Sequence, residues 1–570
     1  MRLAAPRRPI ARMLRAFAAA LASIVAPHAA LGADPLLAGA ELRYHISPHA
    51  WGDEERSLRI VLSFVGEPDG TTELALPDRW GGAAGLGRCI RNLRALTPGA
   101  SVLPVPQRPN LLQVTHPPMR AVQIEYHVVQ DEPSSPLTVL RLNRPVLRLG
   151  WFYAIGQALF VIPRWDQNAQ RELSVTWSGL PAGWNLSGPW GEGAGEQRAR
   201  GDIGDLRGAT FIGGAGLRSS LRDEAGAAVT LITRGEWPFP DADLLDLAAH
   251  ITGAQRRLLD DHTPMKATVI AIQTDEHPSN TGGEARTGGV SLYMPSGIVA
   301  AQDAAFLLAH EMFHLWNPRR IGRLAGPRLT WFSEGVTDWA AARTLDEIGL
   351  WGEGRFIVWI NSVLRDYSLS SARALPVDQL LARRSESPEA SRMPYLQGAI
   401  LAHNWEADLR RISGGSLSFQ NVLRRLVATR LASPLDEERI ADAFPADMRE
   451  GVLREIRRCI IGGGVIDPRP DAFAPRLVLT QEFLHAFDPG FEVDPSLVRG
   501  VITGVRPGSA AWRAGLRDGQ LWVGGGVTRD PDEWAEIVIA DDRGAQRIIR
   551  YLPRSGHTHR VPQYRLPSAR

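Results

Sequence analysis

Cysteine is almost absent from this chain, since Cys89 and Cys459 are the only two among 570 residues. So few thiols exclude both a scaffold held together by disulfides and a metal site built from cysteines. An oxidising compartment would permit one bond between the two cysteines, and two free buried thiols are the alternative. The sequence leaves this choice open.

The chain also lacks a charge excess and long apolar runs. Its formal net charge is +2, and residues 1–33 account for it, because they hold five arginines and no acid and their removal leaves −3. A nucleic-acid-binding protein needs a clustered basic face, so that class of partner is excluded. No apolar run after the N-terminus approaches the ~20 residues that a membrane-spanning helix needs.

Residues 1–33 have the composition of a secretory signal peptide. Arginines precede an Ala-rich apolar stretch, and Gly32 and Ala33 supply small residues at a cleavage point before Asp34. The apolar stretch is too short for a stable anchor, although an uncleaved N-terminal anchor remains the alternative. We expect an exported protein, periplasmic or secreted, with no stable membrane span after signal cleavage.

The remaining length exceeds what one hydrophobic core supports, so we expect several domains. Residues 34–235 are predicted to form a β-rich domain, with strands at 58–65 and 121–128 separated by Pro, Gly and Asn. This domain contains no catalytic motif that we recognise.

The pattern changes in residues 236–465. Two buried strands are predicted at 267–272 and 290–294, and helical spacing dominates from residue 300 to about 459. A Gly- and Pro-rich stretch at 462–475 then predicts a linker. The last compact segment is residues 475–560.

The sequence His310-Glu311-Met312-Phe313-His314 has the pattern of a zinc-binding motif. Residues four apart lie on one face of a helix, which suits two imidazoles that bind one zinc ion. Glu311 lies beside such a metal without binding it, where it can take a proton from the attacking water. The alternative is a solvated helix face that happens to carry two histidines.

An acidic segment further along the chain offers the third protein ligand that zinc needs. Glu334 follows His314 after 19 intervening residues, enough for a loop that brings a second helix against the first. We expect Glu334 to be the third zinc ligand. Asp338, four residues later on the same face, would accept a hydrogen bond from a ligand histidine. The alternative for both acids is an ordinary charged first turn of a helix.

The runs His310 to Arg320 and Trp331 to Asp338 resemble the glycyl aminopeptidase family of metallopeptidases, M61. The match extends beyond the five-residue core to Leu-Trp-Asn and to Glu-Gly-Val-Thr-Asp. This resemblance implies a thermolysin-like α+β catalytic domain with a helical part, of the gluzincin kind, one zinc ion per chain, and a peptide or protein substrate.

Two further residues receive roles through the same resemblance. Tyr395 lies in Met-Pro-Tyr-Leu-Gln-Gly, which resembles a segment whose tyrosine stabilises the developing oxyanion, and a core tyrosine is the alternative. The family also has a Gly-Gly-x-Glu-His segment whose glutamate holds the free amine of the substrate. Here Glu284 follows Gly282-Gly283 one residue early, so it is either the amine ligand or a solvated turn residue. If Gly288-Gly289 is the matching pair instead, Ser291 replaces the acid.

Residues 500–521 resemble a PDZ domain of the kind attached to bacterial proteases, with a strand, a Pro-Gly-Ser turn, a short helix and a Gly-Leu-x-x-Gly turn. Such domains bind peptide C-termini by adding a strand to a sheet edge. A purely structural cap is the alternative.

The sequence therefore predicts an exported zinc metallopeptidase with three domains: β-rich, catalytic and PDZ-like. The first expectation is an aminopeptidase that prefers small N-terminal residues. An endopeptidase of the same fold and a non-catalytic peptide-binding protein that uses its PDZ-like domain are the alternatives.

Overall fold

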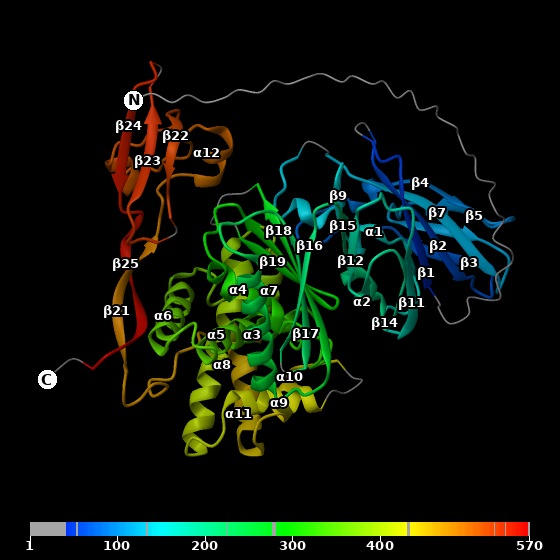
Figure 1. The fold of residues 1–570 in the computed structure, drawn as a ribbon. Helices are drawn as coiled ribbons and strands as arrows, with labels where there is room; N and C mark the ends of the chain where they lie inside the picture. Colours follow the sequence, from blue (N-terminus) through cyan, green and yellow to red (C-terminus); the bar gives the residue numbers. More distant parts are fainter. Residues whose placement is uncertain are drawn as a thin grey trace, which may run out of the picture.

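The computed structural model describes residues 42–567 apart from short gaps. The gaps are residues 53–54, 133–134, 225, 276–280, 430–433, 529 and 542. The predicted signal peptide, residues 1–33, lies outside the described residues. Within the described part, no helix has both the length and the apolar character needed to cross a membrane. Figure 1 shows a β-rich N-terminal part, a central part rich in helices, and a small C-terminal β part.

Three sheets form the N-terminal part. The six-stranded sheet has the order β14 (Gly195–Gly201), β11 (Arg171–Trp177), β1 (Leu42–His49), β2 (Ser57–Val65), β7 (Ala121–Val129), β4 (Ile90–Ala95). The four-stranded sheet has the order β10 (Ile162–Pro163), β3 (Thr71–Ala75), β6 (Leu111–Thr115), β5 (Ser101–Pro104). The five-stranded sheet has the order β13 (Gly191–Glu192), β12 (Asn185–Gly188), β15 (Thr210–Gly214), β9 (Trp151–Ile155), β8 (Val146–Arg148). Helices α1 (Gly156–Leu159) and α2 (Ile203–Gly208) are short.

Alternation along the strands explains why these segments form sheets. In β7, Val122, Ile124, Tyr126 and Val128 are fully buried, and they join one apolar cluster with residues of β1 and β2. A period of two places one face of a strand against the core. The strands predicted at 58–65 and 121–128 are therefore confirmed as β2 and β7.

A mixed five-stranded sheet begins the central part. Its order is β16 (Arg218–Glu224), β17 (Ala227–Arg234), β18 (Met265–Thr274), β20 (Gly289–Pro295), β19 (Gly282–Arg286), and β17, β18 and β20 are parallel. The continuous apolar run in β18 is typical of a parallel strand that is covered on both faces. Strands β16 and β17 precede the predicted domain boundary at residue 235, yet they belong to this sheet: β16 pairs with β17, and β17 pairs with β18.

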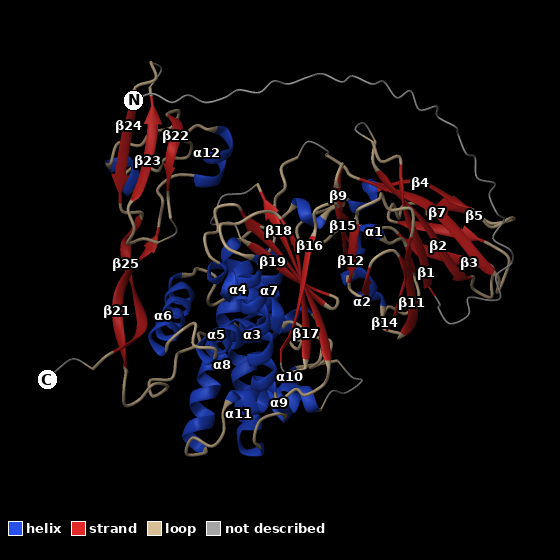
Figure 2. Cartoon of the chain, in the orientation of Figure 1, coloured by secondary structure: helices blue, strands red, loops and turns tan. Residues whose placement is uncertain are grey.

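Helices cover one side of this sheet and continue beyond it (Figure 2). They are α3 (Asp241–Leu259), α4 (Ala305–Phe313), α5 (Val336–Glu347), α6 (Glu353–Leu369), α7 (Val377–Arg383), α8 (Pro388–Ile412), α9 (Phe419–Ala428), α10 (Glu437–Asp442) and α11 (Ala446–Ile456). One large apolar cluster joins the sheet to the helices, and it includes the fully buried Trp316, Trp331, Trp339 and Trp405. The helical character predicted for residues 300–459 is confirmed.

The C-terminal part has a small core of its own. Strands β22 (Leu521–Gly526), β23 (Ala535–Ala540) and β24 (Gln546–Tyr551) form a sheet, accompanied by α12 (Val493–Arg499) and α13 (Ala510–Arg513). Phe491, Ile502, Leu516 and Ile537 lie in the core. The short helix and the following strand occur where the sequence predicted them, whereas the identity of this part as a PDZ domain stays a prediction.

The chain passes to and from this part through a two-stranded ribbon. Strand β21 (Val478–Phe487) leads outward and β25 (Arg554–Arg565) returns antiparallel to it. The returning strand packs on α6, where the side chain of Asn361 donates to the carbonyl of Tyr564 and accepts from its amide. The predicted linker at 462–475 is also packed rather than free: the amide of the buried Ile466 donates to the hydroxyl of Tyr367.

The two cysteines are both buried and both free. Cys89 lies in the N-terminal part and Cys459 in the wide helical turn that follows α11. Of the two alternatives left open by the sequence, the structure has the free thiols.

Candidate metal centre

The two histidines of the motif extend from the end of α4. His310 lies in the last turn of the helix, and His314 directly follows it with backbone angles that are still helical. Their Nε2 atoms are 3.1 Å apart, and the side chains are largely buried. The i, i+4 spacing therefore brings the two imidazoles to one point, as predicted.

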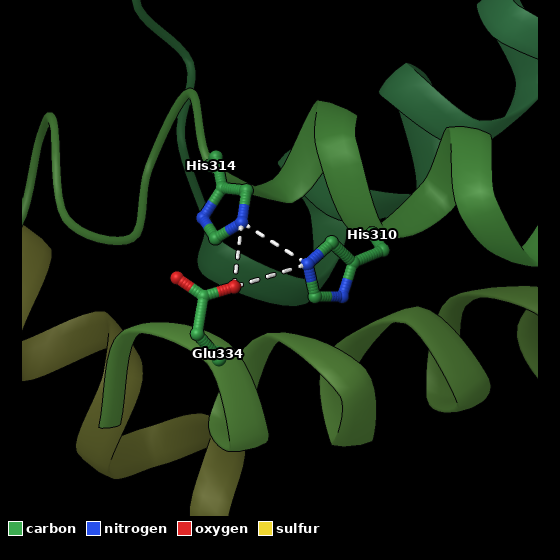
Figure 3. Close-up of side chains that lie close together, drawn as sticks. All are labelled: His310, His314 and Glu334. Atoms are coloured by element: carbon green, nitrogen blue, oxygen red, sulfur yellow. Dashed lines mark hydrogen bonds and ion pairs between the residues drawn. The ribbon is translucent and has the colours of Figure 1, made fainter. Parts of the chain in front are cut away.

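Glu334 reaches this point from a second helical segment. It lies in a wide turn, Trp331–Gly335, that runs directly into α5. Its Oε2 atom is 3.4 Å from Nε2 of His310 and 3.5 Å from Nε2 of His314 (Figure 3). Among the described residues, this is the one group of three or more His, Cys, Asp or Glu side chains close enough to hold a metal ion.

The spacing of these three atoms fits zinc. Tetrahedral bonds of the lengths that zinc forms to nitrogen and oxygen place neighbouring ligand atoms roughly 3.4 Å apart. The observed separations of 3.1, 3.4 and 3.5 Å lie around that value. Two imidazoles and one carboxylate are also the donor set of several zinc hydrolases, in which a fourth position stays open.

The other nitrogen of each histidine is already engaged. His310 Nδ1 lies 2.8 Å from Oδ1 of the buried Asp338, and His314 Nδ1 lies 2.7 Å from the carbonyl oxygen of Asn317. A proton on each Nδ1 leaves Nε2 free to bind a metal and fixes the orientation of the ring. The structure thus places Asp338 where the sequence predicted it.

Charge also favours a cation at this point. Burial alone would raise the pKa of Glu334, but its hydrogen bonds with His310 and His314 hold that pKa well below its usual range. The carboxylate therefore remains ionised in a largely buried position, as a metal ligand must.

Glu311 lies beside the cluster and against strand β19. It is 8% exposed, and burial raises the pKa of its carboxyl group. A Cβ added at Gly283 would lie 2.9 Å from Cγ of Glu311, closer than real side chains come. The edge strand therefore passes directly over Glu311, and only glycine leaves room for it at this position.

Tyr395 closes the site from α8. Its ring lies 6.0 Å from the His310 ring, and the two planes are 20° apart. Burial raises the pKa of its hydroxyl group, so the phenol stays protonated and can donate a hydrogen bond at neutral pH. Helix α8 comes this close because Gly398 meets the backbone of the Glu334 turn, where a Cβ would lie 1.9 Å from the carbonyl oxygen of Trp331.

Glu284 has an unexpected environment. On β19 it lies next to Gly283, and because neighbouring residues of a strand point to opposite faces, its side chain points away from the face that meets Glu311. It pairs with the buried Arg286 and accepts a hydrogen bond of 3.3 Å from Nε1 of Trp80, which comes from the N-terminal part. It is therefore not the solvated turn residue of the alternative.

Sequence reasoning missed three of these residues. Asn317 could have been noticed, since it belongs to the Leu-Trp-Asn run that carries the family resemblance. Arg286 lies two residues after Glu284 on β19, but nothing in the sequence indicated that it is buried and paired with Glu284. Trp80 gave no signal, because its position in the site depends on a contact between distant parts of the chain.

No protein-family model matches the chain, and no curated protein matches it. Among solved structures, the fold is similar to that of an aminopeptidase N family protein from Idiomarina loihiensis. That similarity has a TM-score of 0.65 at 15% identity and covers 92% of this chain and 98% of that chain. An M1 zinc metallopeptidase from Deinococcus radiodurans aligns with 76% of this chain and 96% of that chain, at 16% identity and a TM-score of 0.47.

The first similarity defines the class of fold. The chain has the multidomain architecture of aminopeptidase N-like proteins, with a β-rich N-terminal part and a helical domain. The predicted fold class is correct at this level.

Proposed function

We propose that this chain is an exported zinc metallopeptidase that removes residues from the amino ends of peptides. One observation carries the proposal: His310, His314 and Glu334 converge with zinc-like spacing beside the buried Glu311. The resemblance of the motif to the M61 glycyl aminopeptidases, which are gluzincins, supports this function, and so does the similarity of the fold to an aminopeptidase N family protein.

The side chains have separate tasks in peptide hydrolysis. A zinc ion at the cluster would supply a Lewis acid that polarises the scissile carbonyl and acidifies the attacking water. Glu311 accepts the proton of that water and later delivers it to the leaving amine, a transfer that its raised pKa favours. Tyr395 donates a hydrogen bond to the developing oxyanion.

Strand β19 offers a place for the substrate backbone. It is the last strand in the sheet order on the side of the site, and an extended peptide can pair with such an edge. Antiparallel pairing is slightly the more stable arrangement, and it directs the amino end of the peptide toward Arg286.

The N-terminal part closes that end of the strand. The amide of Thr287 donates to the carbonyl of Gly208 at 3.0 Å, and its hydroxyl donates to the carbonyl of Asp205 at 2.8 Å. Trp80 reaches Glu284 one residue from Gly283. A peptide chain has little room to continue past this point, which supports an aminopeptidase. Glu284 points to the other face of β19, so its side chain would bind the substrate amine after turning from Arg286 toward this edge.

The ion pair of Glu284 with Arg286 favours an alternative. If Arg286 holds Glu284 permanently, the site lacks an anchor for the amine, and an endopeptidase of the same fold is the second candidate. A third candidate is a non-catalytic peptide-binding protein that uses residues 475–560. The main proposal has three further parts: the protein is exported, it prefers small N-terminal residues, and residues 475–560 form a PDZ domain.

Paired peptides test the proposal directly. Zinc-loaded protein and its Glu311→Gln variant are given one peptide with a free amine and the same peptide with an acetylated amine. Cleavage of the free-amine peptide alone, lost in the variant, is the expected result. Cleavage of both peptides would identify an endopeptidase. Cleavage of neither would contradict the proposed activity.

A further inference from the structure

We propose that Asn317 is a positioning residue that links the two metal-binding segments and sets the geometry of His314 and Glu334. The inference rests on the proposed zinc site, and it assigns a task to a residue that touches neither the metal ligand atoms nor the substrate. Asn317 is fully buried just beyond α4, between the histidine segment and the turn that carries Glu334.

Its main chain holds His314. Nδ1 of the imidazole donates to the carbonyl oxygen of Asn317 at 2.7 Å, which directs Nε2 toward the cluster. His310 differs, because its Nδ1 partner is the carboxylate of Asp338. A neutral carbonyl orients a ring without adding charge to it, so this contact controls the direction of the His314 ring rather than its basicity.

Its side chain holds the turn of Glu334. Nδ2 donates to the carbonyl oxygen of Phe332 at 2.9 Å and to Oγ1 of Thr337 at 3.1 Å, and the carbonyl of Ser333 lies at 3.4 Å. These acceptors lie on both sides of Glu334. In a wide turn the ordinary i to i+4 bonds are interrupted, so some carbonyls need a donor from elsewhere. Asn317 supplies that donor.

The burial of this amide is unfavourable in itself. Within the described part of the chain, its Oδ1 atom is buried with no hydrogen-bond partner. An unpaired buried acceptor destabilises a folded protein, and a side chain chosen only for packing would avoid it. The contacts of Nδ2 and of the main chain therefore point to a role in holding the ligands.

Zinc affinity tests the inference with a matched control. Asn317→Ala is compared with Asn404→Ala, which removes another fully buried asparagine whose Nδ2 donates to a carbonyl, that of Asp467 at 2.9 Å, outside the metal centre. We measure the zinc dissociation constant by chelator competition, the visible spectrum of the cobalt-substituted protein, and the unfolding temperature of the metal-free protein.

We expect Asn317→Ala to weaken zinc binding about 10–100-fold and to change the cobalt spectrum, as other changes around metal ligands do. Asn404→Ala is expected to lower the unfolding temperature while zinc affinity and spectrum stay as in the wild type. Equal effects of the two variants on zinc affinity would show a general loss of stability and overturn the inference, as would an unchanged affinity in Asn317→Ala.

A milder variant covers the case in which Asn317→Ala does not fold. Thr337→Val keeps the shape of the side chain and removes one acceptor of Asn317, so a loss of affinity of about threefold is expected. Wild-type affinity in Thr337→Val would then overturn the inference. If the wild-type protein itself binds no zinc, the proposed function fails together with this inference.

Discussion

The metal centre has two sides that differ in origin. The helical side carries His310, Glu311, His314 and Glu334 within a short stretch of sequence, and helix geometry brings them together. The strand side consists of β19 and of Trp80, which is 204 residues away from Glu284 in sequence. We propose that the chemistry belongs to the first side and the choice of substrate to the second.

This difference predicts that substitutions on the two sides will have different effects on activity. Changes on the helical side should remove metal or turnover for every peptide. Changes on the strand side should leave the metal in place and alter either the position of the base or the choice of peptide. Five sets of substitutions test the division, beginning with the largest expected effect.

The first prediction concerns the ligands. Replacement of His310, His314 or Glu334 by alanine should abolish stoichiometric zinc and reduce hydrolysis to background, because three protein ligands are the usual minimum for a catalytic zinc. Metal analysis of purified protein, with circular dichroism as the check on folding, provides the measurement. Stoichiometric zinc in all three folded variants would contradict the ligand set.

The second prediction separates the base from the metal. Glu311→Gln keeps the size of the side chain and should keep zinc, while kcat falls by about 10²–10⁴ because proton transfer is lost. Steady-state rates and zinc content are measured on the same sample. Near-normal turnover in this variant would show that another residue acts as the base.

The third prediction concerns the oxyanion. Tyr395→Phe removes one hydroxyl and should lower kcat by about 10²–10³, the usual effect of losing one donor to an oxyanion. The KM value should change little, because the bond forms mainly in the transition state. An effect confined to KM would place Tyr395 in substrate binding instead.

The fourth prediction moves to the strand side. Gly283→Ala adds a methyl group that would meet Cγ of Glu311 at 2.9 Å, and the displaced base should lower kcat roughly 10–100-fold with zinc retained. Gly282→Ala is the matched control, since its methyl group would meet Val139 rather than Glu311. Equal losses of kcat in the two variants would argue against contact with the base.

The fifth prediction, with the smallest expected effect, concerns the preference for peptides with a free amine. Glu284→Gln should lower kcat/KM about tenfold for peptides with a free amine, because a charge-assisted hydrogen bond to the ammonium is lost. Acetylated peptides should be cleaved as by the wild type, and their rates are measured in parallel. An unchanged rate for free-amine peptides would remove Glu284 from the binding site and favour the endopeptidase.

The sequence predicted the helical side almost completely, for a physical reason. Spacing along a helix determines which side chains share a face, so the sequence alone is enough to pair His310 with His314. Glu334 and Asp338 followed from the need of zinc for a third ligand and of a histidine for an acceptor. Their convergence requires only that two neighbouring helices pack together.

The arrangement of the strand side could not be predicted from spacing along the sequence. The face on which Glu284 lies depends on the register of β19, and one residue of shift reverses it. Its partner Arg286 shares that strand and that face, whereas Trp80 meets it only after the N-terminal part docks. The pairing of β17 with β18, which brings β16 and β17 into the central sheet, was missed for the same reason, since sheet partners are chosen by long-range contacts.

The antiparallel ribbon of β21 and β25 has a mechanical consequence. A single flexible tether lets an attached module sample a large volume, whereas two paired strands that pass back to α6 resist both bending and rotation. The C-terminal part is thus presented in a restricted orientation to the helical body. Any peptide bound there would be held near the proposed active site at a high and nearly constant effective concentration.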